Sequence, residues 1–208
     1  MHRSFAQLIE EVTSEKAPGP SPTFSVFHMV LAIELIAKKP IGRNALAERL
    51  KIGEGAVRTI ISRLRDADLI ATSKAGCSLT KKGVSVWKEY TSILKKFEIG
   101  KSELTEADCN SVVLIRDQEH KLRAGMEQRD AAIKAGAKNA TTIVFKQGRL
   151  IIPSVSENVV ETFPQAANQI FKLMKPDEQD VIIIVGADTP EKAEYGALAA
   201  AWTLIANY

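Results

Sequence analysis

The sequence is poor in the residue types that build metal centres and disulfide frameworks. It contains two cysteines and three histidines among 208 residues. Cys77 and Cys109 lie far apart in the chain, and His2, His28 and His120 show no spacing typical of metal ligands. We therefore expect no bound metal and no cofactor. We interpret both cysteines as packing residues of a protein in a reducing compartment.

Long hydrophobic runs are also missing. The longest apolar stretch, Val26 to Ala37, is interrupted by His28 and Glu34 and is too short to span a bilayer. The residues that follow Met1 include no apolar run suited to a signal peptide. These features predict a cytoplasmic protein that does not act on a membrane.

Sequence motifs of common enzyme classes are not found either. No P-loop, no spaced glycine fingerprint after a strand and no nucleophile–base pair can be placed on the chain. We therefore expect no enzymatic activity and assign no catalytic residue. An enzyme of unknown reaction in the second half of the chain is retained as an alternative.

The two halves of the chain carry opposite charge. Residues 1–100 contain 16 basic and 10 acidic residues, whereas residues 101–208 contain 12 basic and 15 acidic residues. This asymmetry indicates that only the first half contacts a polyanion. With 45% hydrophobic residues, each half can bury a core of its own. We expect two domains, residues 1–100 and 101–208, with the boundary in the polar segment 98–110.

The first half is predicted to be mainly helical. Apolar spacing predicts helices over residues 4–16, 23–39, 43–50 and 54–68, the second of them capped by Thr23 after the breaker run Pro18 to Pro22. Two short strands follow at 69–73 and 77–80, joined by the turn Lys74-Ala75-Gly76. A long helix from Lys81 to about Phe97 completes this half.

The segment from Asn44 to Leu64 is the most informative part of the chain. Its first helix has an inner face of Leu46, Ala47 and Leu50, and its second helix has an inner face of Val57, Ile60, Ile61 and Leu64. The turn Lys51-Ile52-Gly53 forces a sharp angle between the two helices. This pattern is typical of a helix-turn-helix, in which the second helix enters a major groove of DNA.

With the hairpin and basic helix that follow, residues 24–97 resemble the winged-helix transcription regulators. The resemblance implies that outward positions of the second helix meet base edges, while its flanks and the wing meet phosphates. The base-facing candidates are Glu54, Gly55, Ala56, Arg58, Thr59, Ser62 and Arg63. The candidates for phosphate contacts are Arg43, Arg63, Lys74, Lys81 and Lys82.

Among these candidates Arg58 is the best base reader, because its guanidinium can donate two hydrogen bonds to guanine. Thr59 and Ser62 are suited to a base or to a phosphate. Glu54-Gly55-Ala56 departs from the usual pattern, since polar readers are common at these positions. We therefore expect modest sequence specificity, or specificity that depends on DNA shape.

The second half is predicted to alternate strands and helices. We expect a buried strand at 112–115, a helix at 126–135, a hairpin at 141–146 and 149–152, a helix at 157–174 interrupted at Pro164, a strand at 181–185 and a helix at 190–206. This order, β-α-β-β-α-β plus a C-terminal helix, matches a ferredoxin-like arrangement. The overall class is therefore α+β, with a winged helix-turn-helix followed by an α/β sandwich. The final helix, rich in small residues, is expected to pack on the sheet or across a dimer interface.

Three polar segments of the second half are candidates for holding a ligand, although each can also be read as a turn or a helix cap. Two follow predicted strands, and one opens a helix. The segment that ends in Asp188 and Thr189 also leads into a helix, and the exposed amides at the N-terminus of that helix would favour an anion. The residues of the three segments are Arg116 and Asp117; Glu127, Arg129 and Asp130; and Asp188 and Thr189.

Over its full length the sequence resembles an archaeal family of winged-helix proteins whose C-terminal domain has no known function. The resemblance rests on the helix-turn-helix segment together with Glu127 to Ile133 and Gly186 to Thr189. It implies a transcription regulator and indicates no ligand. We expect this regulator to bind double-stranded DNA as a homodimer, because two recognition helices would read half-sites about one helical turn apart. We also expect the second domain to bind a small-molecule effector, by analogy with other ferredoxin-like domains. A scaffold that binds proteins through both domains is the other alternative; steeply salt-dependent binding of duplex DNA would separate the two.

Overall fold

The computed structural model describes residues 4–14 and 23–206. The chain divides into two compact units, residues 1–91 and 92–208, so the boundary lies nine residues before the expected one. The expected helix from Lys81 to Phe97 ends earlier: helix α5 spans Lys81–Ile93, and strand β3 (Leu94–Ile99) follows directly. Phe97 and Ile99 alternate onto one face of the sheet of the second unit, and this packing overrides the helical spacing.

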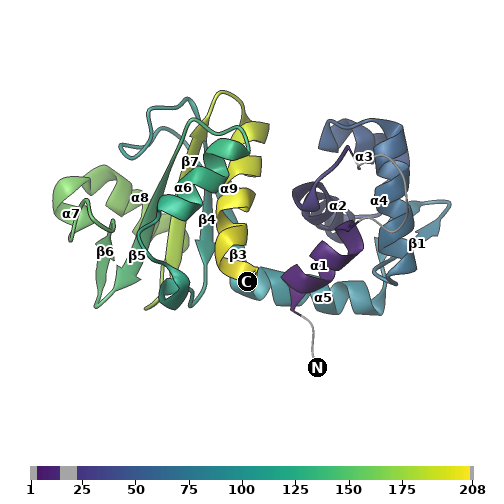
Figure 1. Ribbon diagram of the computed structural model, residues 1–208, viewed down its shortest axis with the longest axis horizontal. Coiled ribbons are helices and arrows are strands. Elements are labelled where there is room, and N and C mark those ends of the chain that lie inside the picture. Colours follow the sequence, from purple (N-terminus) through teal and green to yellow (C-terminus); the bar gives the residue numbers. More distant parts are fainter. Residues whose placement is uncertain (1–3, 15–22, 207–208) are drawn as a thin grey trace. The chain divides into compact units, whose positions relative to one another are not determined.

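The first unit contains the helices and the hairpin that the sequence predicts (Figure 1). Helix α3 has the predicted bounds, and Lys51 in the turn after it adopts φ 56°. The elements before α5 are α1 (Phe5–Thr13), α2 (Val26–Lys38), α3 (Arg43–Leu50), α4 (Glu54–Asp66), β1 (Ile70–Ser73) and β2 (Gly76–Leu79).

Helix α1 packs within the first unit. Ser4 and Gln7 form a capping box at its N-terminus, and Phe5, Ile9 and Val12 are buried. The Phe5 ring lies 4.5 Å from the ring of Tyr90 in α5. The predicted Lys16 and the breaker run 18–22 lie outside the described residues.

Helix α2 begins two residues later than predicted, because Ser25 caps it instead of Thr23. The Ser25 hydroxyl accepts a hydrogen bond from the Phe27 N–H, and the Nδ1 of His28 accepts one from the Ser25 N–H at 3.1 Å. His28 thus takes the part that Glu or Gln plays in a capping box. Its burial lowers its pKa below the usual value of 6.5.

This cap predicts a loss of stability in acid. A lowered pKa in the folded state means that the unfolded chain binds the proton more tightly, so stability is present above about pH 6.5 and is lost as the pH falls below it. Protonation also removes the Nδ1 lone pair that accepts the Ser25 N–H. We expect His28→Gln, which keeps a capping box without a titrating group, to reduce this dependence in urea titrations between about pH 7 and pH 5. His120→Gln, at an exposed position, should not.

The wing is fixed beside the start of α3. Ile41 and Cys77 form an antiparallel bridge with N–H to O distances of 3.1 and 2.8 Å. Gly76 has φ 115°, and a Cβ there would lie 2.6 Å from the Ile41 carbonyl, so only glycine fits. The β1–β2 hairpin is therefore held next to the N-terminus of α3.

The second unit has one five-stranded antiparallel sheet covered by helices on both faces (Figure 1). The strand order is β3-β4-β7-β5-β6. After β3 its elements are β4 (Cys109–Ile115), the 3-10 turn η1 (Glu119–Lys121), α6 (Met126–Lys134), β5 (Asn139–Lys146), β6 (Arg149–Ile151), α7 (Val159–Thr162), α8 (Pro164–Met174), β7 (Val181–Ala187) and α9 (Pro190–Ile205).

The α+β class is confirmed, but the strand order differs from the ferredoxin-like one. The last strand, β7, lies between β4 and β5, where a ferredoxin-like sheet would have the third strand of the motif. The short β6 lies at the edge, and β3 adds an edge strand beside β4 that the sequence interpretation assigned to a helix. The predicted hairpin at Gln147-Gly148, the break at Pro164 and the Thr189 cap of α9 are all observed.

Alternate residues of the central strands face two different cores. Val112, Leu114, Ile182 and Ile184 lie in the cluster beneath α8. On the other face, α9 packs against the sheet and α6, and a Cβ at Gly196 would lie 2.9 Å from Ala137. The small residues of α9 therefore serve packing within the unit.

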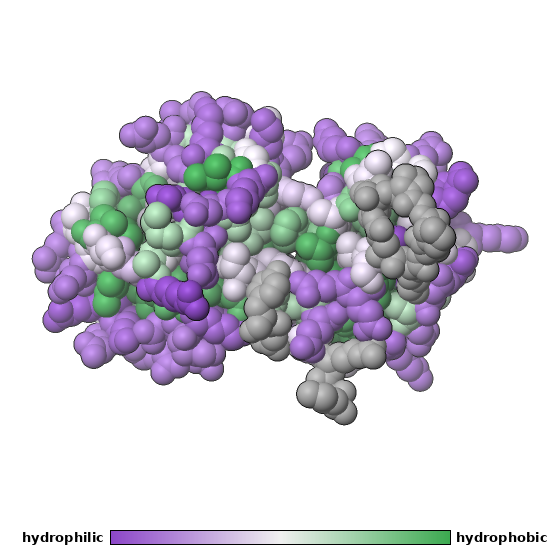
Figure 2. Space-filling model, viewed as in Figure 1, coloured by the Kyte–Doolittle hydropathy of each residue, from purple (hydrophilic) through white to green (hydrophobic). Residues whose placement is uncertain are grey.

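On the face of the second unit that Figure 2 shows, hydrophobic residues lie among hydrophilic ones. The exposed large hydrophobic residues of this unit are Met126, Ile133, Val155, Val160, Phe171 and Leu173. Within residues 4–14 and 23–206, no helix combines the length and hydrophobicity needed to cross a membrane.

Candidate nucleic-acid interface

Helix α4 presents one polar face and one buried face. Val57, Ile60 and Leu64 are fully buried. The candidates Glu54, Gly55, Arg58 and Thr59 are exposed, and Ala56, Ser62 and Arg63 are half-buried. The Thr59 hydroxyl donates to the Gly55 carbonyl at 3.2 Å, so it must turn away from the helix backbone to reach a ligand.

Arg63 also has structural contacts within the first unit. Its guanidinium donates to the Thr13 carbonyl, at the C-terminus of α1. It also lies 5.3 Å from the centre of the Phe24 ring, a cation–π contact. Arg63 therefore joins α4 to α1 and to the segment before α2.

Arg43, Arg58 and Lys74 line one groove. The groove has a volume of about 380 Å³ and lies between the start of α3, the outer face of α4 and the wing. These three basic residues come from three different elements, and all three are exposed. None of the groove-lining residues is acidic. The groove therefore offers an anion three cationic side chains at once.

The N-terminus of α3 adds partial positive charge to the groove, because Gly42 and Arg43 line it, whereas the N-terminus of α4 lies outside its lining. Gly42 caps α3 and Gly53 caps α4, and neither provides a side-chain hydrogen bond to the first turn. The first amides of both helices are therefore left for solvent or for a ligand. Such helix ends commonly bind phosphate groups.

The remaining candidates lie outside the groove. Lys81 and Lys82 open α5 and are exposed, and the Lys82 ammonium donates to the Ala67 carbonyl at 2.7 Å. Sequence reasoning missed the exposed Thr72 and Ser73 of the wing, which do line the groove. The alternation of side chains along β1 was the signal that could have identified Thr72.

The polar segments of the second unit do not form one site. Arg116 and Asp117 follow β4 where β7 begins, whereas Asp188 and Thr189 follow the other end of β7. Asp188 pairs with Lys138 at 2.5 Å, and the hydrogen bond from that ammonium lowers the pKa of the Asp188 carboxyl. Thr189 caps α9 by accepting from the Lys192 N–H at 3.3 Å. Asp188 and Thr189 therefore have local partners.

Arg116 is a structural residue as well. Its guanidinium bonds the carboxylate of Asp180, whose side chain is 2% exposed, and that of Asp177 at 2.8 Å. Asp180 also accepts from the backbone N–H groups of Asp117 and Asp177. This cluster fixes the turn before β7 to the end of β4.

Arg116→Ala is therefore expected to lower the free energy of unfolding of the second unit. The carboxylate of Asp180 would keep two backbone donors but lose its counter-charge, so we expect a loss of about 1–2 kcal/mol. Urea unfolding followed by Trp202 fluorescence measures it. Arg123→Ala is the matched control, because the Arg123 side chain is 85% exposed, and it should change stability by less than about 0.5 kcal/mol. Equal effects of the two variants would refute the structural role of Arg116.

Of the third segment, Arg129 lines a pocket between α6 and the edge of β5. Glu127 pairs with Arg123 at 3.5 Å, and Asp130 pairs with Arg129 at 3.2 Å. No group of three or more His, Cys, Asp or Glu residues suited to a metal ion occurs in the part of the chain that the structure describes.

Comparison with known proteins finds similar domains for both units. Residues 27–85 match the PH0730-like N-terminal domain, and residues 107–204 match a domain of unknown function, DUF4443. The hypothetical protein PH0730 from Pyrococcus horikoshii OT3 is 28% identical, with a TM-score of 0.70 over 87% of this chain and 92% of that chain. Lactococcus lactis ZitR is 27% identical over 38% of this chain and 54% of that chain, with a TM-score of 0.29. None of the curated proteins matches the chain. The two-domain resemblance expected from the sequence is thus confirmed.

Proposed function

We propose that this chain, in which a PH0730-like N-terminal domain precedes a domain of unknown function, is a transcription regulator that binds double-stranded DNA. The observation that carries the proposal is the groove that brings Arg43, Arg58 and Lys74 together beside α4. A groove with three cations, no lining carboxylate and the N-terminus of α3 is complementary to a phosphate backbone.

The proposal gives a role to each cation of the groove. Arg58 lies on the exposed face of α4 and reads a base edge in the major groove. Arg43, at the first turn of α3, and Lys74, at the wing tip, hold phosphates on either side of it. Gly55 allows the helix to approach the bases closely, because nothing lies within 4 Å of the position that its Cβ would take.

The proposed assembly is a cytoplasmic homodimer. One α4 helix reads only a few base pairs, whereas two related by a twofold axis read half-sites about 10 bp apart. Selected DNA sites should therefore be inverted repeats with this spacing. The second unit would bind a small-molecule effector that changes the affinity for DNA.

The proposal is tested by selecting genomic duplex fragments with the full chain and titrating the best fragment against a scrambled one. Arg58→Ala should weaken binding of the selected duplex by roughly 10- to 100-fold. Arg58→Lys should retain binding of the scrambled duplex but lose most of the preference for the selected one, because lysine keeps the charge without the two-pronged donor. Failure to enrich any duplex, with and without cell extract as a source of effector, would contradict the proposal.

A further inference from the structure

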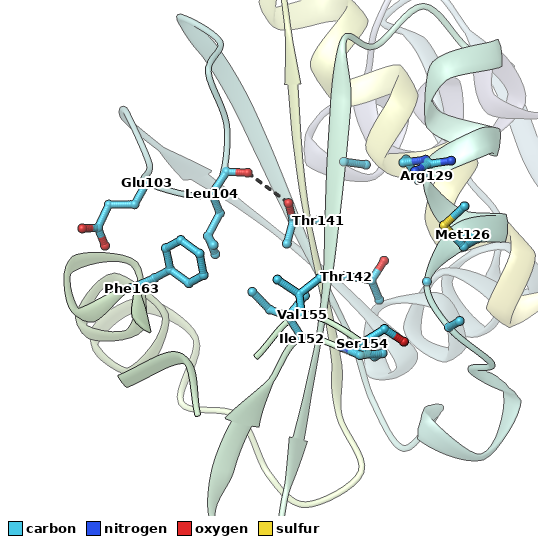
Figure 3. A pocket seen from close by; sticks show the side chains of 14 residues that line it. Glu103, Leu104, Met126, Arg129, Thr141, Thr142, Ile152, Ser154, Val155 and Phe163 are labelled. Atoms are coloured by element: carbon cyan, nitrogen blue, oxygen red, sulfur yellow. Dashed lines mark hydrogen bonds between the residues drawn. The ribbon is translucent and has the colours of Figure 1, made fainter. Parts of the chain in front are cut away.

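The second unit contains a pocket of about 360 Å³ at the outer edge of β5 (Figure 3). It is bounded by the N-terminus of α6, by residues 152–155 and by Phe163 at the start of α8. Its volume is within the range of pockets that hold small organic ligands.

The pocket exists because β6 is too short to cover β5. β6 pairs with β5 only at residues 144–146. Phe145 exchanges backbone hydrogen bonds with Gln179 and Asp180, on the β7 side of the strand. Backbone groups alternate along an antiparallel strand, so those of Ala140 and Thr142 face the other side, beyond the end of β6. Polar backbone atoms of both residues therefore line the pocket.

One end of the pocket is rich in hydrogen-bond donors. Thr142 is 5% exposed, and its buried Oγ1 has no hydrogen-bond partner. Figure 3 shows its side chain directed toward the side of the pocket formed by Met126 and Arg129. Gly125 lies next to it, since a Cβ at Gly125 would be 3.3 Å from Oγ1. An unpartnered buried hydroxyl costs free energy that a bound polar group would recover.

The N-terminus of α6 faces the same end. Gly125 caps this helix with φ 77° and provides no side-chain hydrogen bond, so the first amides of the helix are left to an external acceptor. The guanidinium of Arg129 lies one turn further along and is half-exposed, with Asp130 as its neighbour at 3.2 Å. One cation shared with a carboxylate suits a monoanion better than a multiply charged phosphate.

The other end of the pocket is apolar. Leu104, Val155 and Phe163 line it, and Thr141 fixes Leu104 by donating to its carbonyl at 3.0 Å. Glu103 also lies there, but its carboxylate accepts from the first amides of α8, Gln165 and Ala166, at 3.0 Å each. That carboxylate is thus occupied as a helix cap and is balanced by the helix dipole.

We infer that this pocket binds a small organic acid with an aliphatic or aromatic body. The carboxylate accepts hydrogen bonds from the Thr142 hydroxyl, the first amides of α6 and the Arg129 guanidinium. The body lies against Leu104, Val155 and Phe163. As the effector site of the regulator this inference rests on the proposed function, but binding to the pocket is measured without DNA.

The test is calorimetric titration of the full chain with 4-phenylbutyrate and with its neutral counterpart, 4-phenylbutan-1-ol. For a probe of this size we expect a Kd on the order of 1 mM for the acid and binding about 10-fold weaker for the alcohol. Thr142→Val and Arg129→Gln should each weaken binding of the acid by about 10-fold and leave the affinity for the alcohol unchanged. Thr142→Val removes a hydroxyl without a partner, so it should fold with undiminished stability.

Arg123→Gln is the matched control, because Arg123 precedes the same helix but does not line the pocket, and it should leave both affinities unchanged. The inference is overturned if the acid shows no saturable binding at millimolar concentration, if the alcohol binds as tightly as the acid, or if neither Thr142→Val nor Arg129→Gln weakens the acid. If the chain binds the acid but selects no duplex, the proposed regulator function is contradicted, whereas the inference that the pocket binds an acid is supported.

Discussion

Replacing Arg43, Arg58 and Lys74 together by alanine is expected to weaken the binding of a selected duplex by about 10³-fold. Loss of a bidentate base contact accounts for about 1–3 kcal/mol, and loss of two phosphate contacts accounts for the rest. Since each phosphate contact contributes about 0.9 to the slope of log affinity against log salt, the slope should become less steep by about 2. Titrations of labelled duplex at several salt concentrations measure both quantities.

The matched control removes the same charge from the other unit. Lys95, Lys134 and Lys172 are exposed residues of the second unit. Their joint replacement by alanine lowers the net charge from +3 to 0, as the groove variant does. If binding depended only on net charge, the two triple variants would be equally weakened. That result would contradict the proposal that the groove contacts DNA.

Gly83→Ala is expected to destabilise the first unit, although the same change usually stabilises a helix. A Cβ at Gly83 of α5 would lie 2.0 Å from the carbonyl oxygen of Leu69, so helix and hairpin would have to separate. The gain in helix propensity is about 1 kcal/mol, and the cost of the backbone clash is larger, at about 3 kcal/mol or more. We expect a net loss of about 2 kcal/mol or more in the free energy of unfolding.

Gly55→Ala is the control for that prediction. Gly55 is also helical, but nothing lies within 4 Å of its Cβ position, so alanine should add between a few tenths and about 1 kcal/mol of stability. Trp87 lies in the first unit and Trp202 in the second, so urea unfolding in a Trp202→Phe background reports the first unit. A Gly83→Ala chain as stable as the parent would show that α5 does not pack closely on Leu69.

The helix-turn-helix could be predicted from the sequence because its signals are local. Apolar residues at helical spacing and the turn Lys51-Ile52-Gly53 specify α3 and α4 without reference to the rest of the chain. That Arg58 and Lys74 lie on exposed positions of the helix and the wing tip could be predicted, because these positions follow from the same local pattern. The structural contacts of Arg63 could not be predicted, because its partners, the Thr13 carbonyl and the Phe24 ring, come from distant segments.

The sheet was harder to predict because its order depends on pairing at long range. The apolar runs of β4 and β7 are nearly interchangeable, so composition does not decide which strand is central. The apolar residues of β3 fit both a helical and an extended spacing. Its pairing with β4 determines that the segment forms a strand. Arg116 was read as a ligand residue because Asp180, its partner, lies 64 residues away. That Thr142 lines the same pocket as Arg129 could not be predicted, because β5 and α6 meet there only in the folded chain.

Site-specific photocrosslinking tests the central claim, that the groove beside α4 contacts duplex DNA, most directly. The photoreactive residue p-benzoylphenylalanine would be placed at Thr59 on α4, at Ala75 in the wing or at Lys134 on α6, all of them exposed. Irradiation with a selected duplex is predicted to yield DNA adducts from Thr59 and Ala75 and none from Lys134. A chain that binds the duplex yet crosslinks from Lys134 and from neither position of the first unit would contradict the account.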